Sequence, residues 1–202
     1  MSDVAAMHAG AEPAETPLTP ENWGKLGMWL FLAGDAMSFG CLIVGYGILR
    51  HASTSWPVPA DVLGINLTAV MTFLLIVSSV TMVLALAAIQ DNDKARFKKF
   101  MGFTILGGVI FLGLQAYEWT HLIGHTLPEH NLSFSKDLFA TTFFVLTGFH
   151  GMHVTGGVIY NVSVLAAVNR GRYGAKHVEI AGLYWHFVDL VWILIFTFVY
   201  LV

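Results

Sequence analysis

Five apolar runs, each long enough to cross a lipid bilayer as a helix, take up nearly all of the chain after its first 22 residues. A bilayer core about 30 Å thick needs roughly 20 helical residues, because each adds about 1.5 Å. The polar connections are short, which favours antiparallel neighbours in one bundle. We therefore predict an all-α, polytopic membrane protein, a five-transmembrane-helix bundle with spans at about residues 26–49, 64–89, 100–122, 138–168 and 178–202.

The composition excludes several other classes of protein. Hydrophobic residues make up 56% of the 202 residues and charged residues 11%, whereas a soluble domain carries about 25% charged residues. The net charge of −3 offers no basic surface to a phosphate backbone, so we expect no nucleic-acid partner. The single cysteine, Cys41, is expected to be a small buried hydrophobic residue, since one cysteine makes no disulfide framework.

The first 22 residues differ from the rest of the chain, because they contain several prolines and glutamates and no apolar run of membrane length. We predict a polar, disordered cytoplasmic tail over residues 1–22 and a transmembrane domain over residues 23–202. The tail lacks the basic start and small-residue cleavage site of a secretory signal. The first span is therefore expected to be retained in the mature chain.

Lysine and arginine are unevenly distributed between the two ends of the predicted spans. The two residues at one end are Arg50 and Lys136. The opposite end, formed by the tail, the second loop and the fourth loop, has eight: Lys25, Lys94, Arg96, Lys98, Lys99, Arg170, Arg172 and Lys176. Because cytoplasmic loops carry the excess of positive charge, we predict a cytoplasmic N-terminus and a C-terminus outside.

Ionisable residues within the apolar runs are the strongest functional signal. No lysine or arginine accompanies them at mid-span, and they comprise Asp35, Glu118, His150, His153, Glu179, His186 and Asp189. A carboxyl group at the bilayer centre costs roughly 2.5 to 3.5 kcal/mol, so each is expected to face the bundle interior and to have a partner. A carboxyl without a cation pairs with a histidine or hydroxyl group, or stays neutral.

Depth and spacing group five of these residues. Asp35, His150 and Asp189 fall near the middle of their spans. His150 and His153 are three residues apart on one helix, as are His186 and Asp189 on another, so each pair shares a helix face. We therefore predict an intramembrane polar cluster of these five residues, with at least one carboxyl group neutral at pH 7.

Spacing alone leaves the role of this cluster open. Buried polar pairs fix the rotation and register of packed helices, handle protons, or ligate a metal or haem. A di-iron bundle is disfavoured, because the order His186-x-x-Asp189 is reversed and no glutamate lies beside His150 or His153. A stand-alone transporter using the acids as a relay is a further alternative. The second span, however, has only hydroxyl side chains and no pair of broken helices is evident.

Small residues are expected to form the helix contacts, because the hydrophobic effect does not drive helices together within lipid. The second span supplies hydroxyl side chains for this purpose, at Thr68, Thr72, Ser78, Ser79 and Thr81. The first, third and fourth spans supply glycines, at Gly40, Gly45, Gly47, Gly107, Gly108, Gly113, Gly148, Gly151, Gly156 and Gly157.

Four sequence strings resemble a known family. They read Gly-Met-Trp-Leu-Phe at 27–31, Leu-Gln-Ala-Tyr-Glu-Trp at 114–119, Phe-Phe-Val-Leu-Thr-Gly-Phe-His-Gly-Met-His-Val at 143–154 and Tyr-Trp-His-Phe-Val-Asp-Leu-Val-Trp at 184–192. In this order and with these loop lengths, the chain after the tail resembles subunit III of the haem-copper terminal oxidases, in its bacterial five-helix form.

The resemblance carries over position by position. The family's acid in the first of these helices falls on Asp35, and the glutamate of its Gln-Ala-x-Glu motif falls on Glu118. The remaining motif residues fall on His150, His153, Glu179, His186 and Asp189. None is a metal ligand in that family, so the resemblance implies no catalytic residue, metal site or cofactor in this chain. It places haem and copper in partner subunits, and a bound phospholipid is compatible with it.

The resemblance therefore implies a non-redox subunit of a bacterial respiratory oxidase in the cytoplasmic (inner) membrane, most simply a cytochrome c oxidase. It implies contacts with subunit I, other subunits and membrane lipids, and support for stability and proton uptake during oxygen reduction. The same subunit of a quinol oxidase is the alternative. Two departures matter: seven-helix members have two further helices, and Asp35 stands where those members have the longer glutamate.

Overall fold

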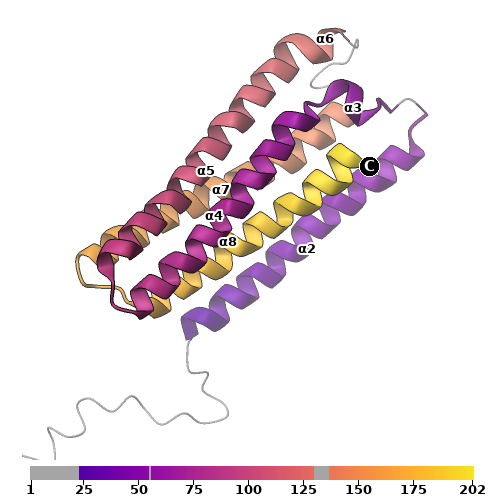
Figure 1. Cartoon of the computed structure of the whole chain (residues 1–202). Helices are drawn as coiled ribbons and strands as arrows, with labels where there is room; N and C mark the ends of the chain where they lie inside the picture. The colour runs from indigo at the N-terminus through magenta and orange to yellow at the C-terminus, as the bar shows by residue number, and fades with distance from the viewer. Residues whose placement is uncertain (1–22, 55, 130–136) are drawn as a thin grey trace, which may run out of the picture.

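A computed structural model of the chain describes residues 23–54, 56–129 and 137–202, so the predicted tail lies outside the described residues. The described parts consist of helices joined by short turns and connections, without a strand. Five helices in them are long and apolar enough to cross a membrane, which confirms the predicted fold class. They lie side by side in one bundle (Figure 1) and cover Trp23–Ala52, Ile65–Gln90, Lys94–Glu129, Leu138–Asn169 and Ala175–Leu201.

The first, second and fourth of these are the uninterrupted helices α2 (Trp23–Ala52), α4 (Ile65–Gln90) and α7 (Leu138–Asn169). The third consists of α5 (Lys94–His121), the π-helical segment η1 (Leu122–Thr126) and the short α6 (Leu127–Glu129). The fifth consists of α8 (Ala175–Ile195) and the π-helical η2 (Phe196–Leu201). One further turn, α3 (Pro59–Val62), lies in the first connection.

The third helix is longer at both ends than the apolar run that predicts it. It begins at Lys94, because Asp93 caps its N-terminus by accepting hydrogen bonds from the backbone N–H groups of Ala95 and Arg96. Asn92 has a φ of 58°, which turns the chain sharply between α4 and α5. Charged residues of the first α5 turns are therefore helical although they fall outside the apolar run.

Helix α8 is the element that contacts most of the others. It packs against α2, α4 and α7, while α5 packs against α4 and α7. Helix α2 packs mainly against α7 and α8 and lies at the edge of the bundle (Figure 1). Its buried residues are Leu32, Phe39 and Tyr46, one every seven positions. Helix α2 is therefore held along a narrow stripe and has most of its surface exposed.

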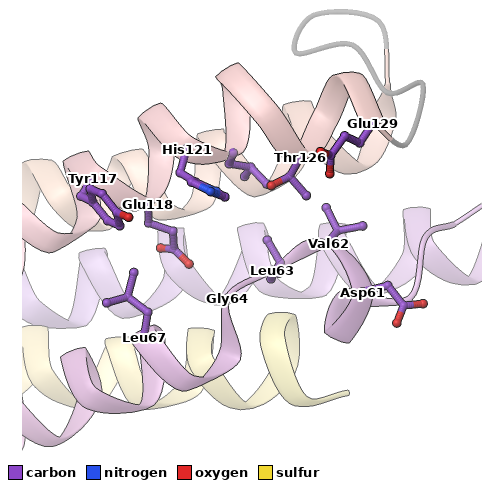
Figure 2. A pocket seen from close by; sticks show the side chains of 11 residues that line it. Asp61, Val62, Leu63, Gly64, Leu67, Tyr117, Glu118, His121, Thr126 and Glu129 are labelled. Carbon is purple, nitrogen blue, oxygen red and sulfur yellow. The ribbon is translucent and has the colours of Figure 1, made fainter.

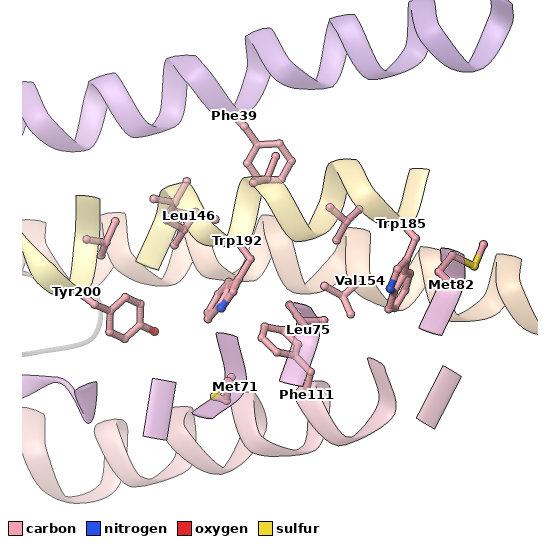
Figure 3. Packing of buried hydrophobic residues seen from close by; sticks show 14 of the residues in the cluster. Phe39, Met71, Leu75, Met82, Phe111, Leu146, Val154, Trp185, Trp192 and Tyr200 are labelled. Atoms are coloured by element: carbon pink, nitrogen blue, oxygen red, sulfur yellow. The ribbon is translucent and has the colours of Figure 1, made fainter. Parts of the chain in front are cut away.

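Aromatic side chains of α8 and η2 fill the core (Figure 3). Trp185, Trp192 and Tyr200 are each at most 1% exposed. Trp185 fits because glycines face it on both sides: a Cβ atom would lie 2.6 Å from its ring at Gly108 and 2.9 Å at Gly157. The prediction that glycines of the third and fourth spans form helix contacts is confirmed at these positions.

The same prediction is wrong for the glycines of α2. A Cβ atom at Gly40, Gly45 or Gly47 would meet nothing within 4 Å among the described residues, and Gly113 of α5 is equally open. The expectation of a buried Cys41 is also wrong, because its side chain is exposed on α2. One reason explains all four α2 positions. The stripe of larger residues on α2 faces α7 and α8, so these small residues lie on the outer surface of the bundle.

Candidate functional site: polar groups between the helices

Asp35 and His153 form the closest contact among the predicted ionisable residues. The Asp35 carboxyl on α2 lies 3.2 Å from Nε2 of His153 on α7, and the two side chains are 15% and 10% exposed. This is an ion-pair separation, without the alignment of a hydrogen bond. The other nitrogen, Nδ1, lies 2.7 Å from the Phe149 carbonyl oxygen and donates to it, since a carbonyl only accepts.

His150 is separate from this pair. Its side chain is completely buried, and neither ring nitrogen has a hydrogen-bond partner among the residues that the structure describes. Aromatic rings surround it: the Trp192 ring lies at a centroid distance of 4.9 Å and the Phe111 ring at 5.8 Å. The structure therefore places His150 in an aromatic core and does not join it to Asp35 or Asp189.

His186 on α8 meets helix α4 through one serine. The Ser79 hydroxyl lies 2.8 Å from Nδ1 of His186, and Asp189 lies one helical turn further along α8. Asp189 is 8% exposed, and its Oδ1 has no hydrogen-bond partner within the described ranges. The shared face predicted for His186 and Asp189 thus meets α4. We call Ser79, His186 and Asp189 the α4–α8 polar group.

Glu118 occupies a second buried position, near the end of α5. Its carboxyl accepts hydrogen bonds from Thr68 at 2.9 Å and from Tyr200 at 3.1 Å, and the residue is 6% exposed. A cavity of about 410 Å³ reaches Glu118 and is also lined by Asp61 and Glu129 (Figure 2). The sequence indicated Glu118 but not its two partners, whose positions depend on how α4 and η2 pack.

Polar contacts fasten α2 at three levels. Near its start, Lys25 Nζ lies 2.6 Å from the Glu179 carboxyl, with both side chains about two-fifths exposed. Asp35 contacts α7 in the middle. At the other end, Arg50 donates to the main-chain oxygen of Val202. These polar contacts add to the narrow stripe of buried apolar residues by which α2 packs on the bundle.

Across residues 23–54, 56–129 and 137–202, no three His, Cys, Asp or Glu side chains converge as a metal-binding set. The three histidines of the predicted cluster have other contacts within the chain. His153 and His186 each engage Nδ1 with a neighbouring group, and His150 faces aromatic rings. These polar groups are suited to holding protons and fixing helix positions between the spans.

The fold and these contacts define a multi-pass membrane protein with carboxyl and histidine side chains paired between its helices. The family model for cytochrome c oxidase subunit III matches residues 18–202. The chain therefore belongs to the cytochrome c oxidase subunit III family, as the four sequence strings indicated.

Individual relatives agree with this assignment. The chain is 42% identical to "Cytochrome c oxidase subunit 3" of Synechocystis over 87% of this chain and 74% of the relative. It is 36% identical to the protein of that name from Alkalihalophilus pseudofirmus, over 87% of this chain and 85% of the relative. A third relative, "Cytochrome bo(3) ubiquinol oxidase subunit 3" of Pseudomonas aeruginosa, is 33% identical over 87% of this chain and 83% of the relative.

Proposed function

We propose that the chain is an integral subunit of a bacterial respiratory oxidase, that it carries no redox centre, and that it packs beside subunit I. In this proposal it stabilises the complex and supports proton uptake while oxygen is reduced to water. Relatives named for cytochrome c and for ubiquinol oxidases support the assembly. Cytochrome c is the proposed electron donor, with quinol as the alternative. The distribution of lysine and arginine supports a cytoplasmic N-terminus in the bacterial inner membrane.

The proposal places haem and copper in the partner subunits. The assignment of the chain to the cytochrome c oxidase subunit III family supports that placement, because the family resemblance gives none of the motif residues as a metal ligand. Membrane phospholipid covers the exposed apolar surface in this proposal. A stand-alone transporter is disfavoured by the family assignment.

The Asp35–His153 contact is the observation that carries the proton-linked part of the proposal. Because Nδ1 of His153 donates to the Phe149 carbonyl, that nitrogen already carries a proton. A favourable contact between Nε2 and the Asp35 carboxyl then requires one further proton, on one atom or the other. The pair is electrically balanced with that proton in place, which suits two polar groups inside a membrane. The pair can therefore hold a single exchangeable proton.

Carbodiimide labelling tests this proton directly. A hydrophobic carbodiimide reacts with protonated carboxyl groups, so we expect it to modify Asp35 in intact membranes near neutral pH. Mass spectrometry of peptides locates the adduct, and the D35N variant, which lacks the carboxyl group, serves as the control. An unlabelled Asp35, in membranes where other carboxyl groups of the chain react, contradicts a neutral Asp35.

Removal of the subunit tests its role during turnover. Stripping this chain from the purified oxidase should leave the initial rate of oxygen consumption largely unchanged, because the haem and copper centres lie elsewhere. The activity should then decay several-fold faster during turnover, and adding the chain back should restore its lifetime. Oxygen-electrode traces measure both quantities. Equal decay with and without the chain refutes the proposed stabilisation of the complex.

A further inference from the structure

The α4–α8 polar group borders a groove on the outer surface of the bundle. The groove lies between α2 and α8 and has a volume of about 390 Å³. Its lining is apolar except for His186, which is the one ionisable residue in it, and comprises Trp29, Leu32, Ala33, Ala36, Leu183, His186, Phe187 and Leu190. A histidine that is bonded to Ser79 on one side thus lines a surface groove with its ring.

The groove lies at the depth of the hydrocarbon core. His186 is near the middle of the fifth span, Ala175–Leu201, and Ser79 is near the middle of α4. Trp29 and Leu190, at the rims, are 53% and 56% exposed. Lipid acyl chains offer no hydrogen bond at this depth, so a polar atom left against them costs several kcal/mol.

The hydrogen bonds of the α4–α8 polar group leave one site open. The Ser79 hydroxyl can either accept from Nδ1 of His186 or donate to it. If Nδ1 donates to Ser79, Nε2 is a bare acceptor. If Ser79 donates to Nδ1 instead, Nε2 carries the proton. In both arrangements the hydrogen bond that the described residues give His186 is made by Nδ1, and Nε2 is left to a further partner.

We propose that this face, formed by α2 and α8 beside α4, docks a transmembrane helix of the partner oxidase subunit, and that this helix offers His186 a hydrogen-bonding side chain. The inference rests on the proposed function. The chemistry points to another protein chain: His186 is an ionisable side chain in an otherwise apolar groove near mid-span, and acyl chains offer it no hydrogen bond. Ala33 and Ala36 are small residues of α2 in the lining, and they allow a helix backbone to approach closely.

A photo-cross-linking amino acid at Leu190 tests the docking face in the assembled complex. Val109 is the matched control, because it is 50% exposed and lies as many residues into α5 as Leu190 lies into α8. Both helices begin at the same end of the bundle (Figure 1). After irradiation of membranes, we expect an adduct between this chain and the haem-bearing subunit from Leu190 and none from Val109.

A second variant tests the hydrogen bond. H186L in the Leu190 background should lower the adduct about threefold, the size of a typical hydrogen bond between membrane helices. Three results overturn the proposal when the chain still co-purifies with haem. They are an adduct from Val109 alone, an adduct between two copies of this chain, and an unchanged adduct yield in H186L. If the unsubstituted chain fails to co-purify with haem, the proposed function fails as well. Co-purification therefore distinguishes failure of the docking proposal from failure of the proposed function.

Discussion

Replacing Gly108 with alanine should destabilise the bundle by overpacking the core around Trp185. The added Cβ would lie 2.6 Å from the Trp185 ring and 2.7 Å from Val158, and both neighbours belong to a packed core. Trp185 has no room to retreat, because Gly157 contacts its other side and its indole N–H donates to Ser78. We expect a loss of about 1–3 kcal/mol in the free energy of unfolding, as for other overpacked cores.

The control for G108A is G113A on the same helix. A Cβ atom at Gly113 would meet nothing within 4 Å among the described residues, so the same chemical change occurs without a clash. Thermal unfolding of the purified protein in detergent, followed by circular dichroism, compares the two. G113A should match or slightly exceed the unsubstituted chain, since alanine favours helix. If G108A and G113A unfold at the same temperature, the core around Trp185 has room for the added methyl group and the prediction is wrong.

Replacing Glu118 with alanine should be comparably damaging, for a different reason. The Glu118 carboxyl is the acceptor for the hydroxyl groups of Thr68 and Tyr200, and its residue is 6% exposed. Removal leaves the Tyr200 hydroxyl buried without this acceptor, while Thr68 keeps its bond to the Gly64 carbonyl. Losing the partner of a buried polar group costs about 1–3 kcal/mol.

Glutamine separates hydrogen bonding from shape at this position. E118Q keeps the length of the side chain and one acceptor oxygen, so it should retain most of the stability that E118A loses. The same detergent unfolding experiment measures both variants. If E118A unfolds at the temperature of the unsubstituted chain, the contacts to Thr68 and Tyr200 do not stabilise the bundle. If E118Q is as unstable as E118A, the carboxyl group is required for more than an acceptor oxygen.

The number and order of the helices could be predicted, because an apolar run must reach a minimum length to cross a membrane as a helix, and five runs do so. Predicting the family was equally direct, since the strings around Glu118, His150 and His186 are specific. The ends of α5 were less predictable. Asp93 and Asn92 extend the helix into charged sequence by capping and turn geometry, which hydropathy does not register.

The pairing of the ionisable residues could not be predicted, because it depends on which helices are neighbours and how each is rotated. Depth alone allowed Asp35, His150 and Asp189 to meet, whereas the structure pairs Asp35 with His153, pairs His186 with Ser79 and places His150 among aromatic rings. The placement of α2 at the edge of the bundle, mainly against α7 and α8, accounts for this division. It also accounts for the exposed glycines of α2. From the sequence alone, these glycines look the same as the contact-forming glycines of α5 and α7.

Affinity purification of the tagged, full-length chain from native membranes tests the central claim most directly. The claim is that this chain is a subunit of an oxidase whose redox centres lie in other subunits. A reduced-minus-oxidised spectrum of the mild-detergent eluate should show haem, and stripping with a harsher detergent should leave the haem with the partner subunits and this chain colourless. Haem retained by the isolated chain, or an eluate without haem from membranes that contain the oxidase, contradicts the claim.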